Sequence, residues 1–76
     1  MELREEIFKI FAEVFEVEIE TVSDLTYQSV ETWDSIGHMM MISAIEEKFE
    51  ISIEMDDVIV ISNVEECLNI VSKYTK

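Results

Sequence analysis

The 76-residue chain contains no proline and only one glycine, Gly37. These two residue types usually mark turns and helix ends, so the boundaries between elements must here be read from hydrophobic periodicity and capping residues. Cysteine is equally scarce, because Cys67 is the only one. A single cysteine excludes an internal disulfide and a cysteine-based metal site. Secreted domains of this size usually carry several disulfides, so the sequence favours a cytoplasmic protein.

Basic residues are also few. Five lysines and arginines stand against 18 aspartates and glutamates, which gives a formal net charge of −13. Such a surface would repel the phosphates of nucleic acids and of anionic membranes, and we expect neither as a partner. Enzymes with basic docking faces would instead be attracted to it.

Long hydrophobic runs are absent. The longest have four residues, at 39–42 and 58–61, whereas a membrane span needs about 20. The first six residues lack the basic start and apolar stretch of a secretory signal. The chain is nevertheless 49% apolar, enough to bury a core. We expect a soluble monomer in which residues 1–76 form one small domain, too small for a deep catalytic cleft beside that core.

Four segments have the pattern of helices. The three longer helices are predicted from hydrophobic spacing and capping residues. Apolar residues recur at helical spacing over about 2–15, and the acidic residues Glu2, Glu5 and Glu6 suit the positive end of a helix dipole there. A second helix is predicted from Ser35, with Asp34 as its N-cap, to about Phe49. The predicted inward residues are Leu3, Ile7, Ile10, Phe11 and Val14 in the first helix, and His38, Met41, Ile42, Ile45 and Phe49 in the second.

The last helix is predicted to start with a capping box, in which Ser62 is the cap and Glu65 reaches back to it. Its apolar stripe is Val64, Cys67, Leu68 and Val71, and Lys73 and Lys76 suit its negative end. The preceding run 58–61 is β-branched and would by propensity be a strand. Because the chain offers no strand to pair with it, we predict a short helix near 55–60.

Between the first two helices, residues 16–33 lack helical periodicity and predict a long loop. Scattered apolar residues would pin it against the helices, with one short turn near 22–25; they are Val17, Ile19, Val22, Leu25 and Val30. The predicted fold is therefore all-α: a small bundle of three main helices and one short helix, with a long first loop.

Few residues are suited to chemistry. The chain has no glycine-rich phosphate loop, no calcium loop and no set of Cys and His ligands. Ser35 and His38 lie three residues apart and are the only pair with the makings of a hydrolytic site. His38, however, is predicted to face the core, which favours a structural histidine. Ser35 follows an acidic cap at the first turn of a helix, so a phosphate on it would meet free backbone N–H groups; the alternative is an ordinary helix cap.

The stretch Trp33-Asp34-Ser35-Ile36-Gly37-His38 opens this second helix, which ends in Glu46-Glu47-Lys48-Phe49. It resembles the signature of acyl carrier proteins, in which Asp-Ser-Leu or a close variant opens the second helix. Ile36 stands where leucine or methionine is usual. Length, charge, helix order and the long first loop extend the resemblance over nearly the whole chain. The Trp33 form is similar to stand-alone carriers of specialised pathways, although Trp33 is equally suited to pack the long loop.

The resemblance implies that Ser35 bears a 4′-phosphopantetheine arm and that Asp34 caps the helix beside it. A phosphopantetheinyl transferase would attach the arm from coenzyme A with magnesium. The thiol of the arm, not Cys67, would then carry acyl groups as thioesters between acyl-loading and acyl-transferring enzymes. The carrier itself would be a tether that raises the effective concentration of its cargo and performs no chemistry.

One departure bears on the partners. Fatty-acid-synthesis carriers have acidic residues soon after the serine, where this chain has Gly37 and Met40. We expect partners to recognise an apolar patch of Ile36, Met39 and Met40, with Glu46, Glu47 and Asp56 at its rim. Alternatively, the methionines only cover loosely packed surface.

Three other functions stay open from the sequence. An aminoacyl or D-alanyl carrier would use the same arm with a different cargo. An acidic helical interaction module would never be modified, and Ser35 would be dispensable. A small hydrolase would need Ser35 and His38 together.

Overall fold

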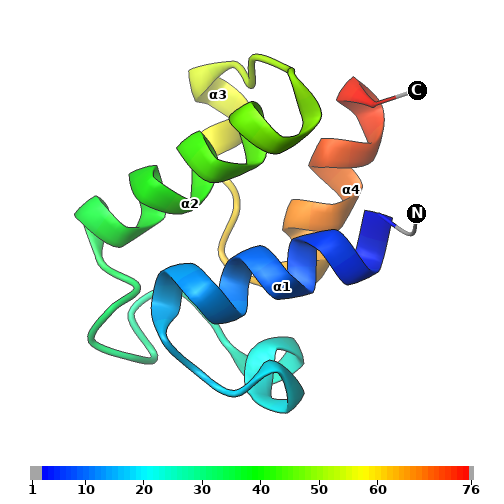
Figure 1. Cartoon of the computed structure of the whole chain (residues 1–76). Helices are drawn as coiled ribbons and strands as arrows, with labels where there is room; N and C mark the ends of the chain where they lie inside the picture. The colour runs from blue at the N-terminus through cyan, green and yellow to red at the C-terminus, as the bar shows by residue number, and fades with distance from the viewer. Residues whose placement is uncertain (1–2, 76) are drawn as a thin grey trace.

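Three long helices and two short ones make up the fold, which the computed structural model describes for residues 3–75 (Figure 1). The sequence-based predictions for Glu2 and Lys76 lie outside that range. No strand occurs within it, so the prediction of an all-α bundle is confirmed. The elements, in chain order, are α1 (Leu3–Phe15), the 3₁₀-helix η1 (Ile19–Asp24), α2 (Ser35–Phe49), α3 (Met55–Val58) and α4 (Val64–Tyr74).

The core lies where α1, α2 and α4 meet, with α3 close to α2 (Figure 1). In α1 the buried residues are Ile7, Ile10, Phe11 and Phe15, while the predicted Leu3 and Val14 are half-buried. In α2, His38, Met41, Ile42 and Ile45 are buried as predicted, and Phe49 is half-buried. The short helix predicted near 55–60 is α3, which ends earlier, at Val58.

The start of α4 corrects one prediction. Asn63, not Ser62, is the N-cap, and its side chain accepts a hydrogen bond from the Glu66 N–H at 2.8 Å. Glu66, not Glu65, reaches back, and accepts from the Ser62 N–H at 2.8 Å. The reason is tertiary: the Ser62 carbonyl accepts from the Tyr27 N–H at 2.9 Å, beside a bridge between Thr26 and Asn63. Ser62 is thereby held outside the helix.

The long loop is ordered by buried side chains. Val22, Leu25 and Trp33 lie in the core, and Val17 and Val30 are half-buried, as predicted. Ile19 is 44% exposed, so the prediction that it pins the loop is wrong. The short turn predicted near 22–25 is η1, which begins three residues earlier. Trp33 is fully buried and stacks on Phe15, with ring centroids 4.9 Å apart, which confirms its interpretation as a packing residue.

The single glycine lies where α2 touches this loop. A Cβ built on Gly37 would stand 1.9 Å from the carbonyl oxygen of Thr32, so only glycine allows this close approach. Thr32 is itself fixed, because its hydroxyl donates to the Phe15 carbonyl at 2.6 Å. Gly37 therefore sets how closely the start of α2 can lie to the end of α1.

Candidate functional site

Ser35 is the first residue of α2, and its side chain is exposed. The preceding Asp34 is the N-cap, as predicted, and its carboxylate accepts from the Gly37 N–H at 2.8 Å. The Asp34 carbonyl accepts from the His38 N–H at 2.8 Å. In the described part of the chain, the N–H groups of Ser35 and Ile36 make no hydrogen bond. They point out of the positive end of a 15-residue helix, where an anion is favoured.

Tyr27 lies next to the hydroxyl of Ser35. Its hydroxyl oxygen lies 3.3 Å from Ser35 Oγ, within hydrogen-bond distance, and either atom is able to donate. Tyr27 was not among the predicted site residues. Tyr27 lies in the long loop, eight positions before Ser35, and no local pattern connects the two.

Two hollows meet at Ser35, and both are mainly apolar. The inner cavity, about 340 Å³, lies between α2 and α3. Its apolar walls are Met39, Met55, Val58, Ile59 and Ile61, and Tyr27, His38 and Ser62 also line it. The outer groove, about 740 Å³, lies along α2 beside Val14 of α1, and its α2 residues besides Ser35 are Ile36, Met39, Met40, Ser43 and Ala44. Met39 is common to both.

His38 is buried at 8% exposure, and both of its ring nitrogens are used. Trp33 Nε1–H donates to Nδ1 at 2.9 Å. Nε2 therefore carries the ring proton and donates to the Val58 carbonyl of α3 at 2.8 Å. No lone pair is left to accept a proton from Ser35, so the arrangement supports a structural histidine and not a hydrolytic pair.

Cys67 is fully buried on the inner side of α4. Burial in the apolar core raises the pKa of its thiol to about 12. Because the thiolate is the reactive form of cysteine, this side chain is not equipped to carry a thioester. It packs as a small hydrophobic residue, in agreement with the interpretation of the sequence.

The exposed apolar surface around Ser35 is wider than predicted. Ile36, Met39 and Met40 are 71%, 43% and 55% exposed, as expected for residues that the core does not use. Met55 and Ile59, which line the inner cavity, are 61% and 70% exposed, and Val60 next to Ile59 is 53% exposed; none of the three was predicted to belong to this surface. The β-branched run at 58–61 was the available signal for Ile59 and Val60, but it was interpreted only as secondary structure.

The three carboxylates predicted at the rim of this surface differ in accessibility. Glu47 and Asp56 are exposed. Glu46 is half-buried, and its carboxylate accepts a hydrogen bond from the Ile53 N–H at 2.8 Å. Glu46 therefore orders the segment between α2 and α3, and is the least available of the three to a partner.

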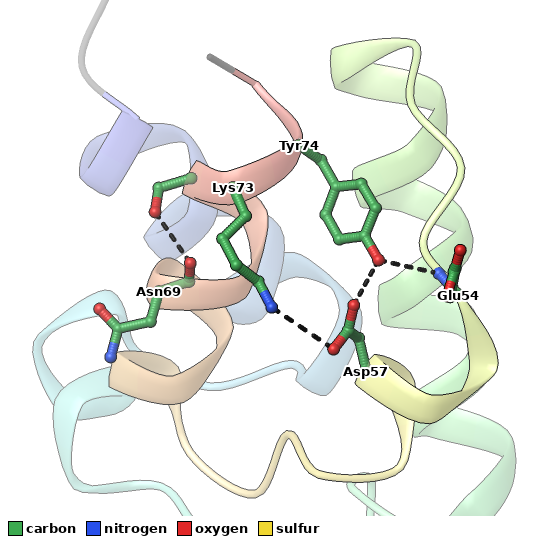
Figure 2. A network of polar contacts seen from close by, with 6 residues as sticks. Glu54, Asp57, Asn69, Lys73 and Tyr74 are labelled. Carbon is green, nitrogen blue, oxygen red and sulfur yellow. Dashed lines mark hydrogen bonds and ion pairs between the residues drawn. The ribbon is translucent and has the colours of Figure 1, made fainter.

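A polar cluster fastens α3 to the end of α4 (Figure 2). Tyr74 donates its phenol proton to Asp57 and accepts from the Glu54 N–H at 3.3 Å, and Lys73 Nζ lies 3.6 Å from Asp57. The Tyr74 hydrogen bond, together with Lys73, lowers the pKa of Asp57 below its ordinary 3.8. The same bond raises the pKa of Tyr74 above its ordinary 10.0. The cluster stabilises the fold fully between pH 3.8 and pH 10.0. Its stabilisation is lost at low pH, as the pH falls through the lowered pKa of Asp57 and the carboxylate is protonated. It is lost at high pH as the pH rises through the raised pKa of Tyr74 and the phenol ionises.

Other kinds of site are not seen in residues 3–75. No group of three or more His, Cys, Asp or Glu side chains there is placed to hold a metal ion. Among the same residues, no helix has the length and apolar character needed to span a membrane.

Comparison with known proteins agrees with this geometry. Residues 5–71 match the family described as "Phosphopantetheine attachment site". A search of curated proteins gives no match. The residues present fit such a group, because an exposed hydroxyl beside unpaired helix N–H groups can hold a phosphodiester and the adjoining cavity is apolar. Since the match spans most of the chain, the protein belongs to the phosphopantetheine-binding carrier family, that of the acyl carrier proteins, whose members bear a covalently attached 4′-phosphopantetheine and are generally not catalytic.

Proposed function

We propose that Ser35 receives the phosphopantetheine arm and that the protein carries acyl groups on it as thioesters. The observation that supports Ser35 most strongly is its position at the start of α2, between the two apolar hollows. Other serines lack this combination. The Ser62 hydroxyl donates to Glu66, the Ser29 hydroxyl accepts from the Thr26 N–H, and the Ser72 hydroxyl donates to the Asn69 carbonyl. Ser23, Ser43 and Ser52 are exposed but do not begin a long helix.

The proposed attachment is a phosphoryl-type transfer performed by a separate transferase. Ser35 Oγ attacks the pyrophosphate of coenzyme A, and a new O–P bond forms as the bond to the 3′,5′-adenosine bisphosphate leaving group breaks. A base of the transferase takes the Ser35 proton. The chain contributes an exposed nucleophile and two free helix N–H groups that offset the negative charge of the phosphodiester.

The first test is intact-mass spectrometry after incubation with coenzyme A, magnesium and a broad-specificity phosphopantetheinyl transferase. A gain of one phosphopantetheinyl unit, placed on Ser35 by peptide fragmentation, is expected. A folded protein that gains no mass with several such transferases would contradict the proposal. The chain would then be an acidic interaction module in which Ser35 only begins a helix.

An acyl cargo is favoured over an aminoacyl or D-alanyl cargo by the lining of the inner cavity. That lining is mainly apolar and contains no carboxylate. A hydrocarbon chain would gain from burial there, whereas the ammonium group of an aminoacyl cargo would be desolvated without a charged partner.

Thermal unfolding of differently loaded proteins tests this choice of cargo. The transferase is supplied with octanoyl-coenzyme A or alanyl-coenzyme A, and each product is compared with the protein that carries the bare arm. We expect the octanoyl form to melt several degrees higher, since about 1 kcal/mol shifts the midpoint of a domain of this size by roughly 4–8 °C. The alanyl form should melt with the bare-arm form. Equal midpoints for all three would contradict an acyl preference.

We further propose that the protein acts as a monomer in which residues 1–76 form one domain. Its partner enzymes are proposed to dock on the apolar patch of Ile36, Met39 and Met40, which is rimmed by Glu47 and Asp56. These apolar side chains are exposed next to Ser35 although the rest of the surface is strongly acidic. Exposed apolar residues with a polar rim are typical of docking sites. Basic faces on the partner enzymes would complement the rim.

Met40→Glu is expected to raise the KM of the transferase for this protein roughly 5- to 30-fold, which corresponds to about 1–2 kcal/mol for a contact at the centre of an interface. The maximal rate should change little, since Ser35 is untouched. Ser23→Glu adds the same charge on η1, none of whose residues lines either hollow at Ser35, and should leave KM unaltered. Unchanged transfer to Met40→Glu, with the variant folded and monomeric by sedimentation, would contradict the role of the patch.

A further inference from the structure

Tyr27 is held rigidly although it lies in a loop. Its backbone N–H donates to the Ser62 carbonyl at 2.9 Å. Its ring packs edge-on against Trp33 and His38, with centroids 6.3 and 5.7 Å away. Both of those neighbours are buried. The hydroxyl is therefore fixed in position 3.3 Å from Ser35 Oγ, while the side chain keeps 37% of its surface exposed.

An arm on Ser35 could enter either the inner cavity or the outer groove, since both are apolar and adjoin Ser35. The free helix N–H groups of Ser35 and Ile36 favour neither direction. Tyr27 lines the inner cavity and not the outer groove. The other polar groups of the cavity wall are already used: both ring nitrogens of His38 are bonded, and the Ser62 hydroxyl donates to Glu66. Among residues 3–75, Tyr27 thus supplies the one hydroxyl on that wall that is available to a group attached to Ser35.

Modification also fixes the direction of the hydrogen bond. In the free protein either hydroxyl is able to donate. Once Ser35 Oγ is a phosphate ester it has no proton, so only Tyr27 can donate. The acceptor is then an oxygen of an anionic phosphodiester, and hydrogen bonds to charged acceptors are stronger than those between neutral groups.

We propose that Tyr27 is a positioning residue whose hydroxyl donates to the phosphodiester on Ser35 and directs the arm into the inner cavity between α2 and α3. This inference rests on the proposed function, because it requires the arm to be on Ser35. It assigns to the phenol a role in the modified protein that is separate from its ring packing.

The test compares wild type and Tyr27→Phe, both converted fully to the arm-bearing form as judged by intact mass. Phenylalanine keeps the ring contacts and removes only the hydroxyl. In Tyr27→Phe we expect the ³¹P resonance of the phosphodiester to shift from its wild-type position. The nuclear Overhauser effects between the arm and the methyl groups of Met55 and Ile59 should be weaker than in wild type. A net hydrogen bond of about 1.5–3 kcal/mol, the range for a charged acceptor, predicts that the ratio of arm inside to arm outside the cavity falls roughly 12- to 150-fold.

Thr21→Val is the matched control, because it removes the hydroxyl of another residue between α1 and α2, one that is bonded to the Glu18 carbonyl and lines neither of the two hollows at Ser35. Its ³¹P resonance and Overhauser effects should equal those of wild type. If Tyr27→Phe also gives the wild-type spectra, the positioning role is overturned while Ser35 remains the attachment site. If wild type gains no arm at all, the proposed function fails, and this inference fails with it.

Discussion

Ser35→Ala is expected to abolish addition of the phosphopantetheine arm, an all-or-none change in intact mass. The hydroxyl oxygen is the proposed nucleophile, and no other serine in the described residues begins a long helix beside an apolar cavity. The fold should survive the substitution. Asp34, not Ser35, supplies the cap, and Ser35 itself is exposed. A thermal midpoint close to that of wild type would show that lost loading reflects the missing hydroxyl.

Ser23→Ala is the control for this experiment, since it removes an exposed serine hydroxyl on η1. It should gain one arm as wild type does. A mass gain on Ser35→Ala would contradict the assignment of Ser35 as the attachment site and would indicate another serine. Loss of loading together with loss of cooperative unfolding would also count against the argument, because it would mean that Ser35 is needed for the fold and not as a nucleophile.

Trp33→Ala is expected to lower the free energy of unfolding by about 3–5 kcal/mol, the range for a large aromatic side chain removed from a core. Trp33 is fully buried, stacked on Phe15 and edge-on to Phe11. Its indole N–H also satisfies His38 Nδ1, which would be left without a donor. At about 0.05–0.15 kcal/mol per residue, a domain of this length has a total of only roughly 4–11 kcal/mol. The variant should therefore lose between about a quarter and all of the stability of the wild-type protein.

Urea titration followed by circular dichroism measures this loss, and Trp33→Phe refines it. Phenylalanine keeps much of the ring packing and removes the indole donor, so its loss of stability should be clearly smaller than that of alanine. A Trp33→Ala variant within about 1 kcal/mol of wild type would contradict the packing described here, since cavities of this size are seldom so well tolerated. The ring of Trp33 also packs against Tyr27 and His38, which both line the inner cavity. Removing the indole should therefore disturb the wall of that cavity next to Ser35.

The scarcity of glycine is visible at two helix ends. Left-handed backbone occurs at Glu16, Gln28 and Glu50, where glycine would be the usual residue. After α1 the Val17 N–H bonds to the Ala12 carbonyl, and after α2 the Ile51 N–H bonds to the Glu46 carbonyl, both at 3.1 Å. These bonds close the helices as a glycine C-cap would. α1 and α2 thus end with the hydrogen bond of a glycine-type C-cap, but with a glutamate in the left-handed position.

The parts of this protein that the sequence alone determined are those governed by neighbours within one or two helical turns. Apolar spacing placed α1, α2 and α4, because side chains three and four positions apart share a helix face. The start of α2 was predicted at Ser35, because the Asp34 carboxylate bonds an N–H only three residues on. The same periodicity predicted that Ile36, Met39 and Met40 lie outside the core, where they are exposed.

Only the tertiary structure decided the features that join distant segments. Tyr27 holds Ser62 out of α4 and so moves its cap to Asn63. The same residue reaches Ser35, while Glu46 turns inward to Ile53 and Tyr74 fastens Asp57 of α3. The inner cavity likewise forms only where residues of α2, of α3 and of the segments around Tyr27 and Ile61 come together. None of these pairings has a local signature, since each depends on how several elements pack at once, and hydrophobic spacing along one segment carries no information about the segment it will meet.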